Sequence, residues 1–257
     1  MKLIQSFFIT LAGLMMSNFS TVMAETDPPI VVTGDWAPFT GQDLPNGGMM
    51  VEIVESALKA AKQLYKLEYL PWKRGYQYTI DTKVMAGFPW MRTEDRIALF
   101  KFSLPFYQAN ERFFVHKSFD RVYEKDEDLK GLTVCLPMGW AVEPMKRFID
   151  KKILTLYQPH TDDACFKGIK TKRVDLYSIN EVTGWHSIKK AKLDPNEFKV
   201  LKPVVRENKY YIVVSKTHPQ GDQFLASFNK GINAIKEDGT YQKILDKHMK
   251  IIQGEQK

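Results

Sequence analysis

Residues 86–107, AGFPWMRTEDRIALFKFSLPFY, place two arginines, Arg92 and Arg96, between two aromatic clusters. A guanidinium group is permanently charged, and its planar fork of N–H donors can bind both oxygens of a carboxylate. Two interpretations of Arg96 follow from this pattern. It is either an ordinary solvated loop charge or a buried group that binds an anion.

The sequence carries none of the common catalytic motifs. It lacks HExxH, a GxSxG elbow and a phosphate-binding GxxxxGK[ST] loop, and NGGMM lacks the remaining glycines of a dinucleotide-binding loop. The histidines have no metal-ligand spacing to another histidine, cysteine or carboxylate. They are His116, His160, His186, His218 and His248. The sequence therefore predicts no metal and no cofactor, and it favours binding over catalysis.

Residues 1–24 have the composition of a secretory signal peptide. A basic start at Met1 and Lys2 precedes an apolar stretch over 3–16, and small residues lead up to Ala24. We expect cleavage after Ala24 and a periplasmic location. A membrane anchor is less favoured, because the apolar run is shorter than the ~20 residues that a spanning helix needs.

The 257-residue chain is mildly basic, with a net charge of +7 that falls to +6 when Lys2 is removed with the signal peptide. Lysine and arginine are interleaved with aspartate and glutamate along the chain. A nucleic-acid surface would concentrate positive charge on one face. We therefore expect no nucleic-acid partner, and the basicity fits an anionic ligand.

Strand and helix patterns alternate along the chain. Between residues 29 and 88 a strand, an amphipathic helix from Met50, a strand, a short helix and a strand follow one another, which indicates parallel βαβ units. The second half repeats this alternation. Its expected strands are 112–116, 131–139, 153–158, 173–179 and 210–216, its expected helices are 141–152 and 161–170, and two helices separated by Gly239 close the chain. The sequence therefore predicts an α/β fold with two similar units.

Several residues with binding chemistry lie directly after expected strands. Trp36, Trp90 and Trp140 do so, as does the pair Asn180 and Glu181. Ligand clefts often lie beyond the carboxyl ends of parallel strands and between domains. We therefore expect these residues to converge on one cleft.

The sequence resembles the family 3 extracellular solute-binding proteins, the receptors of ABC importers for amino acids. TEDRIALFKFSLPFY is similar to the family's T-x-E-R motif and the F-S-x-P block after it, and IKEDGTYQKILDKHM is similar to its closing helix pair. Three shorter matches, APF, GGMMVEIVESAL and DLKGLTVCLPMG, occur in the family's order. The resemblance covers the whole chain after the signal peptide.

The resemblance implies a two-lobed α/β fold of the periplasmic binding protein type II class, with a hinge and a ligand cleft between the lobes. Lobe 1 would contain residues 25–109 and 211–257, and lobe 2 would contain residues 110–210. The resemblance also implies a monomer that binds an amino acid or an amino-acid-like small carboxylate. Its partner would be an ABC permease in the inner membrane.

The resemblance assigns binding roles to individual residues. The family's carboxylate-binding arginine falls on Arg96, whereas Arg92 has no counterpart and is expected at the surface. Trp36 and Trp72 fall at or near positions whose aromatic rings cover the ligand. Trp90 falls on a segment whose backbone contacts it.

Three positions depart from the family's pattern. Met91 replaces a small hydroxyl residue, and Trp140 falls where lobe 2 normally offers a small residue. Asn180 takes the place of an aspartate that binds the ligand's ammonium group, and Glu181 could supply that acid if the loop shifts by one residue. We expect these residues in the site, with an amino-acid-like carboxylate as ligand.

Cys135 and Cys165 are the two cysteines of the chain. In an oxidising compartment such a pair forms a disulfide or remains as two buried thiols. The resemblance places Cys135 in the first strand of lobe 2 and Cys165 on a helix against its sheet, and some family members have a similar pair. We therefore predict a disulfide, which would close a loop of about 30 residues and stabilise the fold by about 3 kcal/mol.

Two other functions are compatible with the same scaffold. Periplasmic cyclohexadienyl dehydratases resemble this family, and Glu181 could serve as their catalytic acid. A ligand-sensing partner of a membrane receptor would bind in the same way but would signal. The favoured hypothesis is a non-enzymatic, periplasmic substrate-binding protein of an ABC importer.

Overall fold

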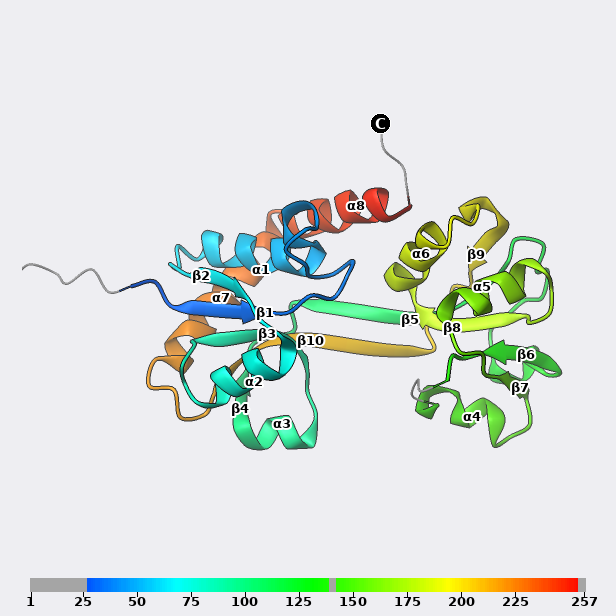
Figure 1. The fold of residues 1–257 in the computed structure, drawn as a ribbon, viewed down its shortest axis with the longest axis horizontal. Coiled ribbons are helices and arrows are strands. Elements are labelled where there is room, and N and C mark those ends of the chain that lie inside the picture. Colours follow the sequence, from blue (N-terminus) through cyan, green and yellow to red (C-terminus); the bar gives the residue numbers. More distant parts are fainter. Residues whose placement is uncertain (1–26, 139–141, 254–257) are drawn as a thin grey trace, which may run out of the picture.

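Two long antiparallel strands, β5 (Tyr107–His116) and β10 (Arg206–Ser215), cross between two groups of helices and strands (Figure 1). The structure is a computed structural model that describes residues 27–138 and 142–253. The two strands pair from Arg206 opposite Glu111 to Tyr210 opposite Tyr107. We call the group on the left of Figure 1 lobe 1 and the group on the right lobe 2.

Lobe 1 contains three parallel strands. β1 (Ile30–Thr33) lies between β2 (Lys66–Tyr69) and β3 (Ala86–Met91) and pairs with both in parallel. β3 and the short β4 (Phe100–Phe102) then pair antiparallel with β10. The helices of lobe 1 are α1 (Met49–Ala60), α2 (Trp72–Ile80), α3 (Glu94–Leu99), α7 (Gly221–Glu237) and α8 (Thr240–Gln253), and the 3-10 turn η1 (Pro45–Gly47) precedes α1. The predicted βαβ order is thus confirmed.

A close approach of α1 and α7 completes the core of lobe 1. A Cβ atom built on Gly231 of α7 would lie 1.9 Å from the backbone oxygen of Ala57 in α1. No side chain fits at that distance, so the glycine lets the two backbones come together. The contact buries apolar residues from both helices, among them Val54 and Phe228.

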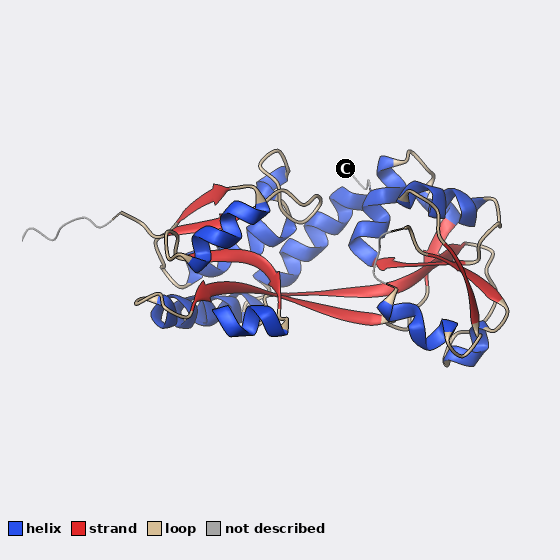
Figure 2. Ribbon diagram, turned by 60° about the horizontal axis from the view of Figure 1, so that its bottom comes forward, coloured by secondary structure: helices blue, strands red, loops and turns tan. Residues whose placement is uncertain are grey.

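Lobe 2 continues the sheet beyond β5. β5 pairs antiparallel with β8 (Leu176–Asn180), and β6 (Leu132–Cys135) pairs in parallel with β8 and β7 (Leu154–Tyr157). β9 (Phe198–Val200) pairs with the far end of β5. The helices are α4 (Lys146–Ile149), α5 (Asp162–Lys170) and α6 (Glu181–Lys190), and the 3-10 turns are η2 (Asp126–Leu129), η3 (Glu143–Met145) and η4 (Pro195–Glu197). In both lobes helices lie on either side of the strands (Figure 2).

The helix predicted over 141–152 is shorter than expected, since only η3 and the four-residue α4 form there. Pro144 lies within η3 and has no backbone N–H to donate, and Lys152, with a φ of 55°, lies outside the right-handed helical region. Residues 139–141, which include Trp140, and the predicted signal peptide lie outside the described residues. Within the described ranges, no helix has both the length and the apolar character that a membrane span requires.

The predicted disulfide is confirmed. Cys135 at the end of β6 is bonded to Cys165 on α5, with an S–S distance of 2.08 Å. Both cysteines are fully buried in an apolar cluster of lobe 2. The bond therefore fixes α5 to the centre of the lobe 2 sheet.

A second contact between the lobes joins α6 to α8. The Nζ atom of Lys189 donates a hydrogen bond to the backbone oxygen of Ile251 at 2.7 Å. Val182 of α6 is buried in the apolar cluster of lobe 1, and Trp185 packs against clusters in both lobes. The two crossing strands are therefore supported by a helix contact on one side.

A pair formed by the buried His248 and the half-buried Glu52 ties α8 to α1. The Nε2 atom of His248 lies 2.7 Å from Oε2 of Glu52, and Lys247 contacts the same carboxylate. Burial lowers the pKa of His248, although the neighbouring Glu52 acts in the opposite direction. Burial acts to raise the pKa of Glu52, but its hydrogen bonds with Lys247 and His248 lower it overall. Both groups therefore take up protons less readily in the folded chain.

Reduction of the disulfide should destabilise the protein. The bonded cysteines are 30 residues apart, and opening this loop should lower the free energy of unfolding by about 3 kcal/mol, because the unfolded chain regains entropy. Thermal unfolding followed by circular dichroism measures the change, with the Cys135→Ala/Cys165→Ala double variant as the control for the reduced protein. Equal melting temperatures for the oxidised and reduced protein would contradict this expectation.

Acidification should destabilise the fold partly through His248. Because its folded pKa is below the ordinary 6.5, its contribution to stability is complete above that value and is lost as the pH falls. The contribution of Glu52 to stability is likewise lost as the pH falls below 4.5, the ordinary pKa of a glutamate. Urea denaturation at several pH values should show that His248→Gln loses less stability than the wild type between about pH 7 and pH 5. Parallel stability profiles for the two proteins would show that burial of His248 has no such effect.

Candidate ligand-binding site

Arg96 lies in α3, the short helix that follows β3. Thr93 is extended, with φ −125° and ψ 161°, and the helix begins at the next residue. This change of direction brings the guanidinium group back to the end of β3, where Nη1 donates to the backbone oxygen of Met91 at 3.0 Å. Its Cζ atom lies 4.7 Å from the ring centroid of Trp90, and the side chain is half-buried. Arg96 is therefore held in place by an aromatic ring and one carbonyl.

Arg96 retains most of its capacity to bind an anion. Among residues 27–138 and 142–253, no carboxylate lies within 4.0 Å of its guanidinium group. Of the five N–H donors in such a group, one is used in the bond to Met91. Arg92, in contrast, is exposed and lies 5.5 Å from the ring centroid of Phe102. The two arginines of the motif therefore have different environments.

Trp72 extends the aromatic surface beside Arg96. Its ring meets that of Trp90 edge-on, with 5.5 Å between the centroids, and its Nε1 donates to the backbone oxygen of Asp35 at 3.1 Å. A Cβ atom on Gly34 would lie 2.6 Å from the indole, so glycine is needed for the ring to lie against the end of β1. We call Arg96, Trp90, Met91 and Trp72 the arginine wall of lobe 1.

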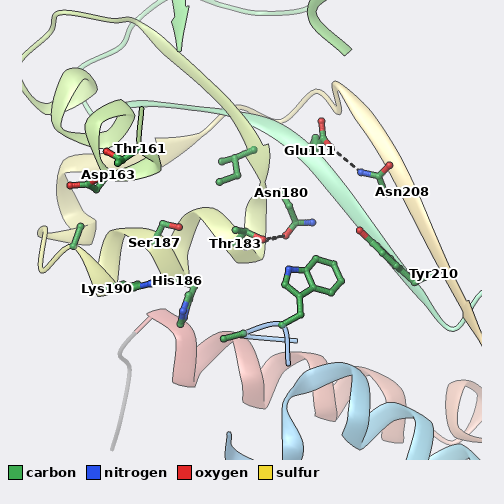
Figure 3. A pocket seen from close by; sticks show the side chains of 14 residues that line it. Glu111, Thr161, Asp163, Asn180, Thr183, His186, Ser187, Lys190, Asn208 and Tyr210 are labelled. Carbon is green, nitrogen blue, oxygen red and sulfur yellow. Dashed lines mark hydrogen bonds between the residues drawn. The ribbon is translucent and has the colours of Figure 1, made fainter. Parts of the chain in front are cut away.

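A cavity of about 760 Å³ opens between the lobes, and we call it the interlobe cavity (Figure 3). Lobe 1 contributes Trp36, and the crossing strands contribute Glu111 and Tyr210. Lobe 2 contributes the end of β8, the exposed face of α6 and the start of α5. The cavity therefore lies where the chain passes from one lobe to the other.

Two titratable groups of the cavity are neutral near pH 7. Burial, with a smaller effect of Glu111, raises the pKa of Tyr210 to about 12. Burial also lowers the pKa of His186, and the nearby Lys190 and Lys189 lower it further. The phenol and the imidazole therefore offer hydrogen bonds without charge.

Asn180 lines the interlobe cavity, whereas Glu181 is not among its lining residues. Asn180 ends β8 and caps α6, since its Oδ1 accepts a hydrogen bond from the backbone N–H of Thr183 at 3.1 Å. The carboxylate of Glu181 lies 3.5 Å from Nε of Arg112. The acid that a dehydratase activity would require is thus engaged with a cation.

The structure places the predicted site residues in two groups. Trp36 and Asn180 line the interlobe cavity, and the four residues of the arginine wall do not. Glu181 belongs to neither group, and Trp140 lies outside the described residues. Within the described ranges, no cluster of three or more histidine, cysteine or acidic residues could hold a metal ion.

Sequence reasoning missed the other residues of the cavity. They lie on the face of α6, at the start of α5 or on the crossing strands, and they include Glu111, Thr161, His186, Ser187 and Tyr210. One signal was available, because Thr161 begins an expected helix that follows an expected strand. The position of Glu111 and Tyr210 depends on the pairing of β5 with β10, which no local pattern reveals.

Residues 29–251 match the family described as bacterial extracellular solute-binding proteins, family 3. The chain belongs to this family. The resemblance carried by the T-x-E-R region and the closing helices is thereby confirmed. No curated protein matches the sequence significantly.

Several solved structures share this fold. Substrate-binding domain 2 of GlnP from Lactococcus lactis, in an open conformation, is 18% identical, with 87% of this chain and 96% of that chain covered and a TM-score of 0.73. The unliganded, open L-cystine solute receptor of Neisseria gonorrhoeae is 20% identical, with 86% and 92% covered and a TM-score of 0.71. The amino acid ABC transporter substrate-binding protein AbpA of Streptococcus pneumoniae, bound to L-arginine, is 18% identical, with 88% and 95% covered and a TM-score of 0.56. The predicted two-lobed periplasmic binding protein type II fold is confirmed.

Proposed function

We propose that this solute-binding protein captures a small carboxylate, an amino acid or a compound like one, and delivers it to an ABC permease. The observation that carries the proposal is the environment of Arg96. Its guanidinium group is half-buried on Trp90, and within the described ranges it has no carboxylate within 4.0 Å. A charged fork that is partly removed from water gains most from an anion that binds both of its edges.

Binding would proceed by closure of the lobes around the ligand. We propose boundaries within the crossing strands, with residues 25–109 and 211–257 in lobe 1 and residues 110–210 in lobe 2. A hinge there would bring the arginine wall toward the cavity face of lobe 2. In support, the TM-scores are 0.73 and 0.71 with two structures described as open and 0.56 with an arginine complex.

The cellular setting is also part of the proposal. We place the protein in the periplasm as a monomer, after cleavage of its signal peptide at Ala24. The family is extracellular, and this supports export. Trp36 and Trp72 would contact the part of the ligand that lies beyond its carboxylate, because aromatic rings bury large apolar area in a fixed orientation.

A thermal-shift screen of L-amino acids and small carboxylates tests the proposal on protein purified after expression of the full chain. A ligand at about 100 times its Kd should raise the melting temperature by about 5–10 °C. Arg96→Ala should reduce this shift to about one third or less, because loss of the fork should weaken binding by at least about 30-fold.

Arg92→Ala is the matched control, since Arg92 lies in the same motif but is exposed. It should keep the shift of the wild-type protein. A ligand that binds the Arg96→Ala variant as tightly as the wild type would refute the role of Arg96. Failure of every carboxylate to bind would refute the proposed ligand class.

A further inference from the structure

The carboxylates around the interlobe cavity already have partners. Asn208 donates from Nδ2 to Oε1 of Glu111 at 2.9 Å. Lys167 lies 2.6 Å from Oδ2 of Asp163, and this bond lowers the pKa of that carboxyl. An ammonium group of a ligand would have to compete with Lys167 for Asp163, and it would have to share the Glu111 carboxylate with Asn208.

The end of β8 is equally unsuited to an ammonium group. Asn180 is neutral, and its only acceptor atom, Oδ1, already receives the backbone N–H of Thr183 at 3.1 Å and lies 3.4 Å from the Thr183 hydroxyl. These bonds fix the amide orientation, since the other end of the side chain can only donate. In Figure 3 the Nδ2 atom points away from Thr183, toward the side of the cavity where Asn208 and Tyr210 lie. Asn180 thus presents N–H donors to the cavity.

The remaining polar groups of the cavity favour an oxygen atom. Hydroxyl groups come from Thr161, Ser187 and Tyr210. The charged Lys190 has no carboxylate within 4.0 Å in the described part of the chain, and His186 adds a ring nitrogen. N–H donors and a cation suit an oxygen substituent and disfavour a positive charge, whereas the hydroxyls can bond to either group.

We propose that the ligand is a carboxylate whose α-substituent is an uncharged oxygen group, as in an α-hydroxy acid, and that Asn180 sets this preference. The inference rests on the proposed function, in which Arg96 binds the carboxylate. Asn180 would donate from Nδ2 to the α-oxygen of the ligand when the lobes close. An α-ammonium group at the same place would face N–H donors and lose its hydration without an acceptor in return.

Isothermal titration calorimetry on matched pairs tests the proposal. The pairs are glutamate, leucine and phenylalanine, each with the α-hydroxy acid of the same side chain and configuration, titrated into protein purified after expression of the full chain. In the pair that binds, the hydroxy acid should bind at least tenfold more tightly than the amino acid. Arg96→Ala should abolish binding of both members.

Asn180→Asp supplies the decisive variant. Aspartate caps a helix as well as asparagine does, so α6 should remain intact, and an unchanged melting temperature checks this. The variant places a negative charge at the end of β8. It should change the ratio of the two Kd values by at least tenfold in favour of amino-acid binding. If Asn180 had only a structural role, the variant would weaken the binding of both ligands equally and leave the ratio of the two Kd values unchanged.

Asp35 provides the control in lobe 1. It is exposed at the end of β1 and accepts the backbone N–H of Gln42 at 3.3 Å. Asp35→Asn should leave the ratio of the two Kd values unchanged. A tenfold loss of amino-acid binding in this variant would place the ammonium group at Asp35 and overturn the proposal.

The outcomes separate this inference from the proposed function. Binding of an amino acid at least as tightly as its hydroxy analogue, with loss of binding in Arg96→Ala, overturns the inference and leaves the function in place. An unchanged ratio in Asn180→Asp also overturns it. If no member of any pair binds, both the inference and the proposed ligand class fail.

Discussion

The antiparallel pairing of β5 with β10 is the constraint on which the molecule depends. Residues 206–210 of β10 pair in register with residues 111–107 of β5. Each strand has one end in lobe 1 and the other end in lobe 2. In the closure that we propose, these two strands would bend and change the angle between the lobes. The contact of α6 with α8 adds a polar and an apolar link beside this pair. A cavity between the lobes is the consequence of this architecture.

The arginine wall of lobe 1 and the interlobe cavity carry different chemistry. On lobe 1, Arg96 lies on Trp90 and keeps most of its N–H donors. On lobe 2, Asn180 adds neutral donors, and the carboxylates in its neighbourhood are engaged by cations or amides. In the closed form that we propose, the arginine and these neutral donors would face the same ligand. Such a set of donors would favour a ligand rich in oxygen atoms.

Much of the fold could be predicted from the sequence, because local patterns determine it. The apolar spacing from Met50 predicts α1, and Gly239 marks the boundary between the last two helices. The start of β10 was missed, since the residues from Arg206 to Lys209 are polar and are held in a strand only by β5. The candidate site shows the same contrast between local patterns and long-range pairing. Arg96 could be singled out because it lies between two aromatic clusters, and Asn180 because it follows an expected strand, whereas Glu111 and Tyr210 lie in the cavity through long-range pairing.

Small-angle X-ray scattering tests the central claim, that the lobes close on a carboxylate held by Arg96. The radius of gyration would be measured for the protein alone and with a saturating carboxylate that raises its melting temperature, and then for Arg96→Ala under the same conditions. The account predicts a smaller radius of gyration with ligand for the wild type and no change for the variant. A ligand that binds the wild type fully without reducing its radius of gyration would contradict closure of the lobes.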